Sequence, residues 1–476
     1  MNSTLPSRFP RRLAIAAAFA ALPFFAGCAD FSGIAPHSSL AAPQAFGLTD
    51  AAIAWPADRW WTIYGDAQLD ALVDRAIAQS PSLKLAQARV NRAAAAAGVA
   101  DSVTKLQVSG AVDSTYQRFT KNSIYPPPLG GARESLNNAN VNFGYDLDFF
   151  GRNRAALDAA LGQADAARAD AQAARTFLAA NVARTYFNLA RLIEQRGVAT
   201  ATLDMREQTR KLVAQRVTNG LDTRVELRQA EGGLPSSRQE IAQIDEQIAL
   251  TRNALAALLG AGPDATAQLA PSLAVVREQA LPATLPADLV GRRADIAAAR
   301  ARVGAASRDI DATKAEFYPN VNLIAFAGFG SIGYANWFKS GSEQYGIGPA
   351  IRIPIFAGGR LRATLSGKTA DYDAAVESYN QALLDAVHDA ADQIASLQAV
   401  AVQSREQKDA QAAAESAYEL SLKRYEAGLA NYLTVLTAEN AVLAQRRQAV
   451  DLKARALDLN VNLNRALGGG YAAAAG

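Results

Sequence analysis

The segment Arg216-Val217-Thr218-Asn219-Gly220-Leu221 returns 208 residues later as Arg424-Tyr425-Glu426-Ala427-Gly428-Leu429. At the same offset, Gly151-Arg152-Asn153-Arg154 matches Gly359-Arg360-Leu361-Arg362. This unit is much longer than a solenoid repeat, which has about 20–50 residues. The chain is therefore predicted to contain two copies of one supersecondary design, and the nature of that design should indicate the function.

The repeat predicts how the chain is divided. Each copy is expected to contain helices, one β-hairpin and one long helical hairpin, and the two β-hairpins are placed at residues 104–149 and 319–356. The predicted segments are a signal peptide (1–27), a lipid-anchored linker (28–58), the first copy (59–262), a linker (263–285), the second copy (286–468) and a tail (469–476).

The composition gives little support to an enzyme. In 476 residues the chain has two histidines, His37 and His388, and a single cysteine, Cys28. A histidine-based triad or a cysteine-rich metal cluster needs more of these side chains. The net charge of +3 indicates neither a nucleic-acid-binding surface nor an acidic tail. We predict a protein that is not an enzyme, binds no nucleic acid or metal, and has no cofactor apart from a covalent lipid.

The first residues are typical of a bacterial lipoprotein signal. Three arginines precede an apolar stretch from Leu13 to Phe25, which is too short to span a bilayer. The stretch ends in Phe25-Ala26-Gly27-Cys28, which resembles a lipobox, in which the cysteine thiol takes the diacylglycerol. Ala29 favours outer-membrane sorting, by resemblance to other bacterial lipoproteins. The alternative is an ordinary signal peptide with an incidental cysteine.

Two pairs of strands are predicted from alternating sequence. In residues 140–149 the apolar positions are Val141, Phe143, Tyr145, Leu147 and Phe149. Residues 106–117, 321–329 and 345–355 alternate in a similar way, and Pro349 and Pro354 in the last segment suit an edge strand or a strand end. At about ten residues, these segments match membrane-spanning strands in length. A small soluble sheet is the alternative.

Four strands cannot close a membrane barrel, and an open sheet edge cannot face lipid. If the strands cross a membrane, several copies of the chain must therefore combine them. Two copies would supply eight strands and three copies twelve. After the signal, no apolar run is long enough for a transmembrane helix.

The segments between the strand pairs predict very long helices. From Leu361 to Leu397 apolar residues recur about every 3.6 positions on one stripe, opposite a face of acidic and amide side chains. Residues 152–212 have the same pattern. Each helix is expected to end in a turn with a left-handed glycine, Gly220 or Gly428. Such lengths are typical of a coiled-coil-like assembly rather than of a globular core.

Several motifs now resemble one family. The segment from Arg59 to Leu72, RWWTIYGDAQLDAL, is similar to the opening of mature outer-membrane efflux lipoproteins, the NodT branch of the TolC-like outer-membrane factors. So are Phe317-Tyr318-Pro319, the segment from Pro354 to Arg360 and the paired Arg-x-x-x-Gly-Leu turns. The resemblance extends from Cys28 to Gly468.

The resemblance implies a mixed α and β fold in a homotrimeric duct. A 12-stranded β-barrel, with four strands per protomer, would lie in the outer membrane of a Gram-negative bacterium, lipid-anchored on the periplasmic side. A long α-helical barrel would extend into the periplasm. The trimer would be the exit channel of a tripartite, proton-driven multidrug or small-molecule efflux pump, with a periplasmic adaptor protein and an inner-membrane transporter as partners.

The resemblance also implies roles for single residues. The helical-hairpin tips would contact the adaptor, and the tip residues singled out are Arg216, Gly220, Leu221, Arg424, Gly428 and Leu429. Counted from Gly428, the bulky position of the family's periplasmic gate is Leu433, and its usual acidic positions are Thr434 and Thr437. We predict a gate closed mainly by Leu433, with both threonines bonded locally. Ordinary interhelical packing of Leu433 is the alternative. Glu439, turned about 200° along the helix from Thr437, is expected to face a neighbouring helix.

Two other functions remain open at this point. The duct of a type I protein secretion system would have the same fold and a different passenger. A lipid-anchored periplasmic coiled-coil scaffold would have no pore at all. A neighbouring gene for a proton-driven transporter, rather than for an ATPase, would favour efflux over protein secretion.

Overall fold

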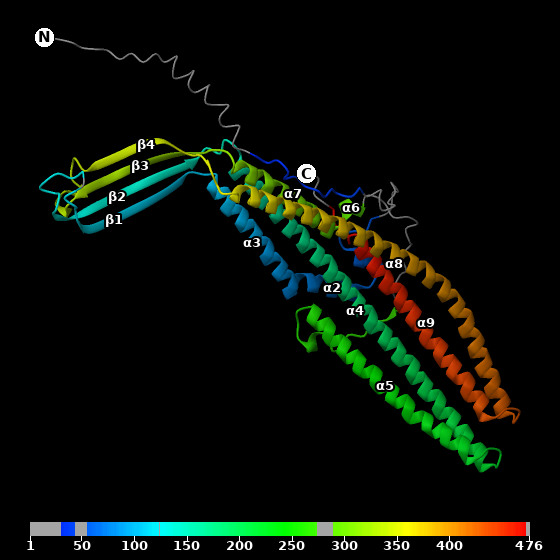
Figure 1. Ribbon diagram of the computed structural model, residues 1–476. Helices are drawn as coiled ribbons and strands as arrows, with labels where there is room; N and C mark the ends of the chain where they lie inside the picture. The colour runs from blue at the N-terminus through cyan, green and yellow to red at the C-terminus, as the bar shows by residue number, and fades with distance from the viewer. Residues whose placement is uncertain (1–29, 43–54, 123, 274–288, 473–476) are drawn as a thin grey trace, which may run out of the picture. The chain divides into compact units, whose positions relative to one another are not determined.

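The computed structural model describes residues 30–42, 55–122, 124–273 and 289–472, and it confirms the predicted mixture of helices and strands (Figure 1). Cys28 and the signal segment lie outside the described residues. The elements in chain order are η2 (Trp60–Tyr64), α2 (Ala67–Gln79), α3 (Pro81–Val103), β1 (Gln107–Arg118), β2 (Arg133–Asp146), α4 (Arg152–Thr218), α5 (Arg224–Leu258), η3 (Pro263–Thr266), α6 (Leu289–Arg292), α7 (Ala294–Ala315), β3 (Asn320–Ile332), η5 (Tyr334–Asn336), β4 (Glu343–Arg352), α8 (Arg360–Glu426) and α9 (Tyr432–Ala466).

The internal repeat is visible in the helix lengths. The helices α4 and α8 each have 67 residues, and their following partners α5 and α9 each have 35. Many of these residues are alanine, arginine, glutamine and leucine, which favour helix even without tertiary contacts. Within the described segments, none of the helices combines the length and the apolar character that a bilayer crossing requires.

The turns between the long helices have the predicted glycine geometry. Gly220 and Gly428 have φ angles of +72° and +78°, which glycine adopts without a side-chain clash. The next amide in each turn donates back across the helix end, from Leu221 to the Arg216 carbonyl (2.9 Å) and from Leu429 to the Arg424 carbonyl (2.8 Å). The predicted left-handed ends are therefore confirmed.

The four strands form one antiparallel sheet in the order β1-β2-β3-β4. In Figure 1 they lie side by side, and β1 and β4 are the two edges. The alternation predicted up to Ile355 stops at Arg352, because Pro354 has no N–H for strand pairing. Since β4 is an edge strand, it accommodates Pro349 as the sequence predicted.

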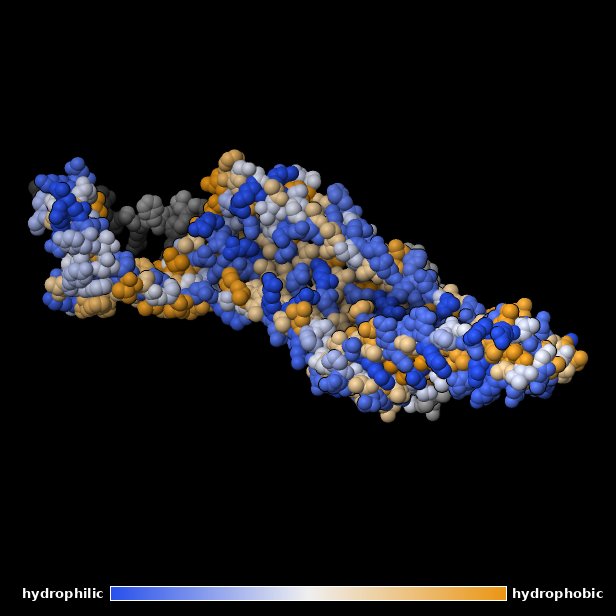
Figure 2. Space-filling model, turned by 90° about the horizontal axis from the view of Figure 1, so that it is seen from below, coloured by the Kyte–Doolittle hydropathy of each residue, from blue (hydrophilic) through white to orange (hydrophobic). Residues whose placement is uncertain are grey.

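The two faces of the sheet differ in polarity. Strand register places Val108, Phe143, Ala325 and Ile347 opposite one another in one row across all four strands. The adjacent row on the other face consists of Ser109, Asn142, Phe326 and Gly346. The apolar face is exposed on the single chain, and Figure 2 shows hydrophobic residues gathered over the strands.

The chain forms two compact units, and each unit contains segments from both copies of the repeat. The first unit contains the sheet, and its core includes Phe31, Ile310, Phe317 and Leu365. The second unit contains α2, α5, α9 and most of α4 and α8. Its largest core cluster is built around Trp60, Trp61 and Tyr64, from the segment that carried the family resemblance.

Candidate functional site

The candidate site is the pair of helical turns at the ends of α4 and α8, both in the second unit. Each following helix begins with a side-chain cap. Thr223 and Glu226 form a capping box at the start of α5, and the Asn431 side chain accepts from the Thr434 amide at the start of α9. The backbone of both turns is therefore fixed by local hydrogen bonds.

A buried polar network joins the two turns. The Arg216 side chain donates to the Asp222 carboxylate at 2.8 Å and to the Tyr425 carbonyl at 2.9 Å, and its guanidinium lies 4.5 Å from the centre of the Tyr425 ring. The Tyr425 hydroxyl donates to the same Asp222 carboxylate. Burial and the neighbouring carboxylate raise the pKa of the Tyr425 hydroxyl well above its usual range, so it retains its proton and remains a donor.

The structure gives Arg216 a different place from the one that the sequence predicted. The sequence placed it among the tip residues, but its side chain is buried and points into the contact between the hairpins. Asp222 and Tyr425 were not singled out from the sequence. Tyr425 in the second copy of the repeat corresponds to Val217 in the first copy. This replacement of an apolar residue by a tyrosine was the sequence signal that could have singled out Tyr425.

The other tip residues singled out from the sequence are exposed: Gly220, Leu221, Arg424, Gly428 and Leu429. Leu221 and Leu429 have 63% and 70% of their surface accessible, and Val225 beside them is also exposed. Figure 2 shows hydrophobic residues at the end of the helical hairpins, among charged ones. Exposed leucines at the tip of a helical hairpin form a surface suited to protein contact.

The expected gate residues lie on the exposed face of α9. Leu433 is 60% exposed on the single chain. The Thr434 hydroxyl donates to Asn431 at 2.9 Å, and the Thr437 hydroxyl donates to the Leu433 carbonyl at 2.8 Å. Both threonines are thus bonded within their own helix turn, and no acidic residue lies in the first turn of α9.

Glu439 has the orientation that the helix geometry predicted. It is 1% exposed and faces away from Leu433, toward α4, where it pairs with Arg206 at 2.6 Å. Among the described residues no group of three or more histidine, cysteine, aspartate or glutamate side chains is arranged to hold a metal ion. The candidate site is therefore a pair of packed helical turns with apolar side chains exposed at the tip.

Comparison with known proteins decides the family. The sequence model of the family described as "Outer membrane efflux protein" matches the chain twice, at residues 72–261 and at residues 285–469. The chain belongs to this family. The two matches follow the internal repeat, so each copy carries the features of an outer membrane efflux protein.

Individual relatives agree with the family. The fusaric acid resistance protein FusA of Burkholderia cepacia is 37% identical over 355 residues, which cover 72% of this chain and 67% of FusA. The multidrug resistance outer membrane protein MdtP of Escherichia coli K12 is 32% identical over 451 residues, 92% of each chain. The crystal structure of the outer membrane protein VceC of Vibrio cholerae matches with a TM-score of 0.83 and 38% identity, covering 87% of this chain and 100% of that one.

These matches confirm the resemblance to TolC-like outer-membrane factors. The protein is an outer-membrane efflux channel and not an enzyme. Family membership also overturns the alternative of a periplasmic scaffold without a pore.

Proposed function

We propose that this outer membrane efflux protein is the exit channel of a tripartite, proton-driven pump for small toxic compounds. The observation that carries the proposal is the pair of equal helical hairpins, each in one match to the efflux family. FusA and MdtP, whose names refer to fusaric acid and multidrug resistance, support small molecules as the passengers. The compound is delivered by a periplasmic adaptor protein and an inner-membrane transporter, which supplies the energy.

The unpaired edges of β1 and β4 support a trimer. A sheet that faces lipid must pair every backbone N–H and C=O, and a four-stranded sheet leaves two edges open. Three chains, with β4 of one paired to β1 of the next, close a 12-stranded barrel with the apolar face outward. The polar face then lines the pore.

The helical tips are the proposed adaptor contact and gate. Leu221 and Leu429 form the apolar contact surface, and Arg216 supports it from inside. In the trimer, three copies of Leu433 meet around the axis and close the pore. Thr434 and Thr437 add no charge, so the constriction has no carboxylate ring to attract cations.

Deleting the gene tests the function. The deletion strain is expected to tolerate several-fold less fusaric acid or ethidium, and a plasmid copy restores tolerance. An uncoupler of the proton gradient should stop ethidium efflux in the complemented strain while ATP is still present. Unchanged tolerance, together with loss of a protein from the culture medium, would contradict the proposal and favour a type I secretion duct.

We further propose that Cys28 carries the acyl chains of a lipoprotein. Cys28→Ala is expected to abolish incorporation of radiolabelled palmitate, because this is the only cysteine in the chain. The variant should still reach the outer membrane, since the barrel is the stronger anchor. Equal labelling of variant and wild-type protein would show that Cys28 is not the lipid-bearing residue.

A further inference from the structure

The helix α5 contains a weak segment close to its tip. Gly232-Gly233-Leu234-Pro235 lies in the interior of the helix, about two turns after its first residue, Arg224. Glycine and proline are the least favourable residues inside a helix, and Pro235 has no N–H to donate to the Glu231 carbonyl. If α5 bends anywhere along its length, it bends most easily here.

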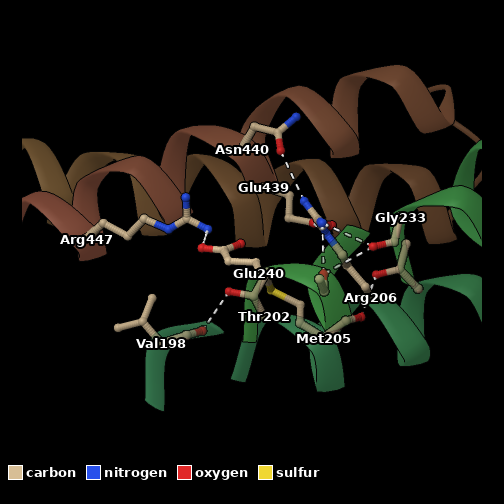
Figure 3. Close-up of polar contacts among 11 residues, drawn as sticks. Val198, Thr202, Met205, Arg206, Gly233, Glu240, Glu439, Asn440 and Arg447 are labelled. Carbon is tan, nitrogen blue, oxygen red and sulfur yellow. Dashed lines mark hydrogen bonds and ion pairs between the residues drawn. The ribbon is translucent and has the colours of Figure 1, made fainter. Parts of the chain in front are cut away.

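One side chain from the neighbouring helix holds this segment. Arg206 of α4 donates to the Gly233 carbonyl at 3.3 Å and to the Ser237 hydroxyl at 2.9 Å, both on α5. The same guanidinium donates to Glu439 at 2.6 Å and to Asn440 at 3.3 Å, both on α9. Figure 3 shows Arg206 with dashed lines to Gly233, Glu439 and Asn440, so this one guanidinium links the weak segment of one hairpin to the other hairpin.

The contact lies between two hydrophobic clusters of the long helices. On the side of the helical turns is the tip cluster, which consists of Val213, Ala230, Tyr425, Tyr432 and Val435. Farther from the turns, along α4 and α5, is the shaft cluster, which consists of Leu189, Leu192, Ala199, Ile244 and Ile248.

Several side chains near Arg206, between the two clusters, are both buried and polar: Thr202, Thr209, Ser237 and Glu439. The apolar side chains of Val442 and Leu443, in the next turn of α9, are buried as well. Thr202 and Thr209 donate to carbonyls of their own helix, a bond that often bends helices. At this level, directional bonds from Arg206 to α5 and α9 add to the apolar packing.

The Arg206 pair also differs from the other ion pairs between these helices. Arg196–Asp245 and Arg238–Glu207 join α4 to α5 with their side chains about half exposed. Arg447–Glu240 joins α9 to α5 with both side chains partly exposed, whereas Glu439 is almost fully buried. A buried charge must keep its partner, while an exposed pair contributes little. Of these pairs, the Arg206 contact is therefore the one whose loss is expected to have the largest local effect.

We propose that Arg206 is a positioning residue that keeps the Gly232–Pro235 segment straight and thereby sets how far the tip of α5 bends away from α9. The bend is a property of the single chain. Its link to opening of the pore rests on the proposed channel function.

Hydrogen exchange of the purified full-length protein tests the bend. In Arg206→Met, amides of residues 224–237 are expected to exchange about tenfold faster, because the segment loses its brace. Amides of residues 241–258 should exchange at the wild-type rate. The matched control, Arg196→Met, breaks the exposed pair between the same helices and should change neither region. Glu439→Gln, which keeps a hydrogen-bond acceptor, should give a smaller increase in the same peptides.

A variant with a stiffer α5 distinguishes a local hinge in this helix from general destabilisation of the protein. Gly232→Ala with Pro235→Ala restores helix-favouring residues, and a Cβ at position 232 meets no atom within 4 Å. Adding both changes to Arg206→Met should return exchange to the wild-type rate. An undiminished effect in the combined variant, or faster exchange along all of α5, would overturn the hinge.

Planar-bilayer recordings test the link to the pore. Arg206→Met is expected to spend several-fold more time in conducting states than wild-type protein, and the stiffened variant should cancel the increase. Faster exchange of residues 224–237 with unchanged channel behaviour would retain the hinge and overturn its part in gating.

Discussion

Arginine in place of Phe143 is expected to prevent assembly of the channel in the outer membrane, whereas arginine in place of Asn142 is expected to leave assembly intact. The two positions are adjacent in β2 but lie on opposite faces of the sheet. On the proposed barrel, Phe143 faces lipid and Asn142 faces the pore. An arginine on the lipid face costs about 2–4 kcal/mol per subunit near the bilayer centre.

The register places Phe143 near the centre of the apolar face. On this face the paired residues of neighbouring strands form five successive rows. Each row contains one residue of β3, and these residues are Val321, Leu323, Ala325, Ala327 and Phe329. Phe143 pairs with Ala325 in the middle row. At about 3.3 Å per residue the five rows extend ~26 Å along the strands. At a strand tilt of about 40° this covers about 20 Å of height, most of an apolar band about 25 Å tall.

The measurement is the amount of heat-modifiable oligomer in outer-membrane fractions of cells producing each variant. Ile351→Arg, in the row of Val321 near the end of the apolar face, should have an intermediate effect. Normal assembly of both Phe143→Arg and Asn142→Arg would contradict a lipid-facing sheet and favour a soluble one.

Removal of the Leu433 side chain is expected to raise single-channel conductance several-fold. Leu433 is exposed on the single chain, and the proposed trimer brings three copies together at the narrowest point. Leu433→Gly opens this ring while costing about 1 kcal/mol in helix propensity, so the oligomer should still form.

The matched control is Leu429→Gly, which removes another exposed leucine from the turn before α9. It should leave the conductance of the isolated channel unchanged, because Leu429 belongs to the adaptor surface. If Leu433→Gly leaves conductance unchanged while trimers assemble normally, the gate lies elsewhere.

The sequence was sufficient for the parts of the structure that depend on local pattern. The repeat of the Arg-x-x-x-Gly-Leu turns predicted two helical hairpins, and the alternation around Phe143 predicted a sheet with two unlike faces. The inward orientation of Glu439 followed from 100° of rotation per helical residue. In each case the signal lies within a few residues of chain.

Contacts between distant segments could not be predicted in the same way. Arg206 and Glu439 are separated by 233 residues, and neither has a local pattern that names the other as partner. Arg216 was expected at the surface because arginine in a polar turn usually lies there, but the carbonyl of Tyr425 draws it inward. Pairing of this kind depends on how the hairpins pack, which no single segment encodes.

The equal lengths of α4 and α8 restrict how such a channel can be redesigned or can evolve. Arg216 near the end of one helix meets Tyr425 near the end of the other, so a change in the length of one helix alone would misalign the two ends. A longer version requires matched insertions in all four long helices, in steps that preserve the rotation of each face. Eighteen residues make five full turns, about 27 Å, so a uniform insertion of that size is the natural increment for fitting the channel to a wider periplasm.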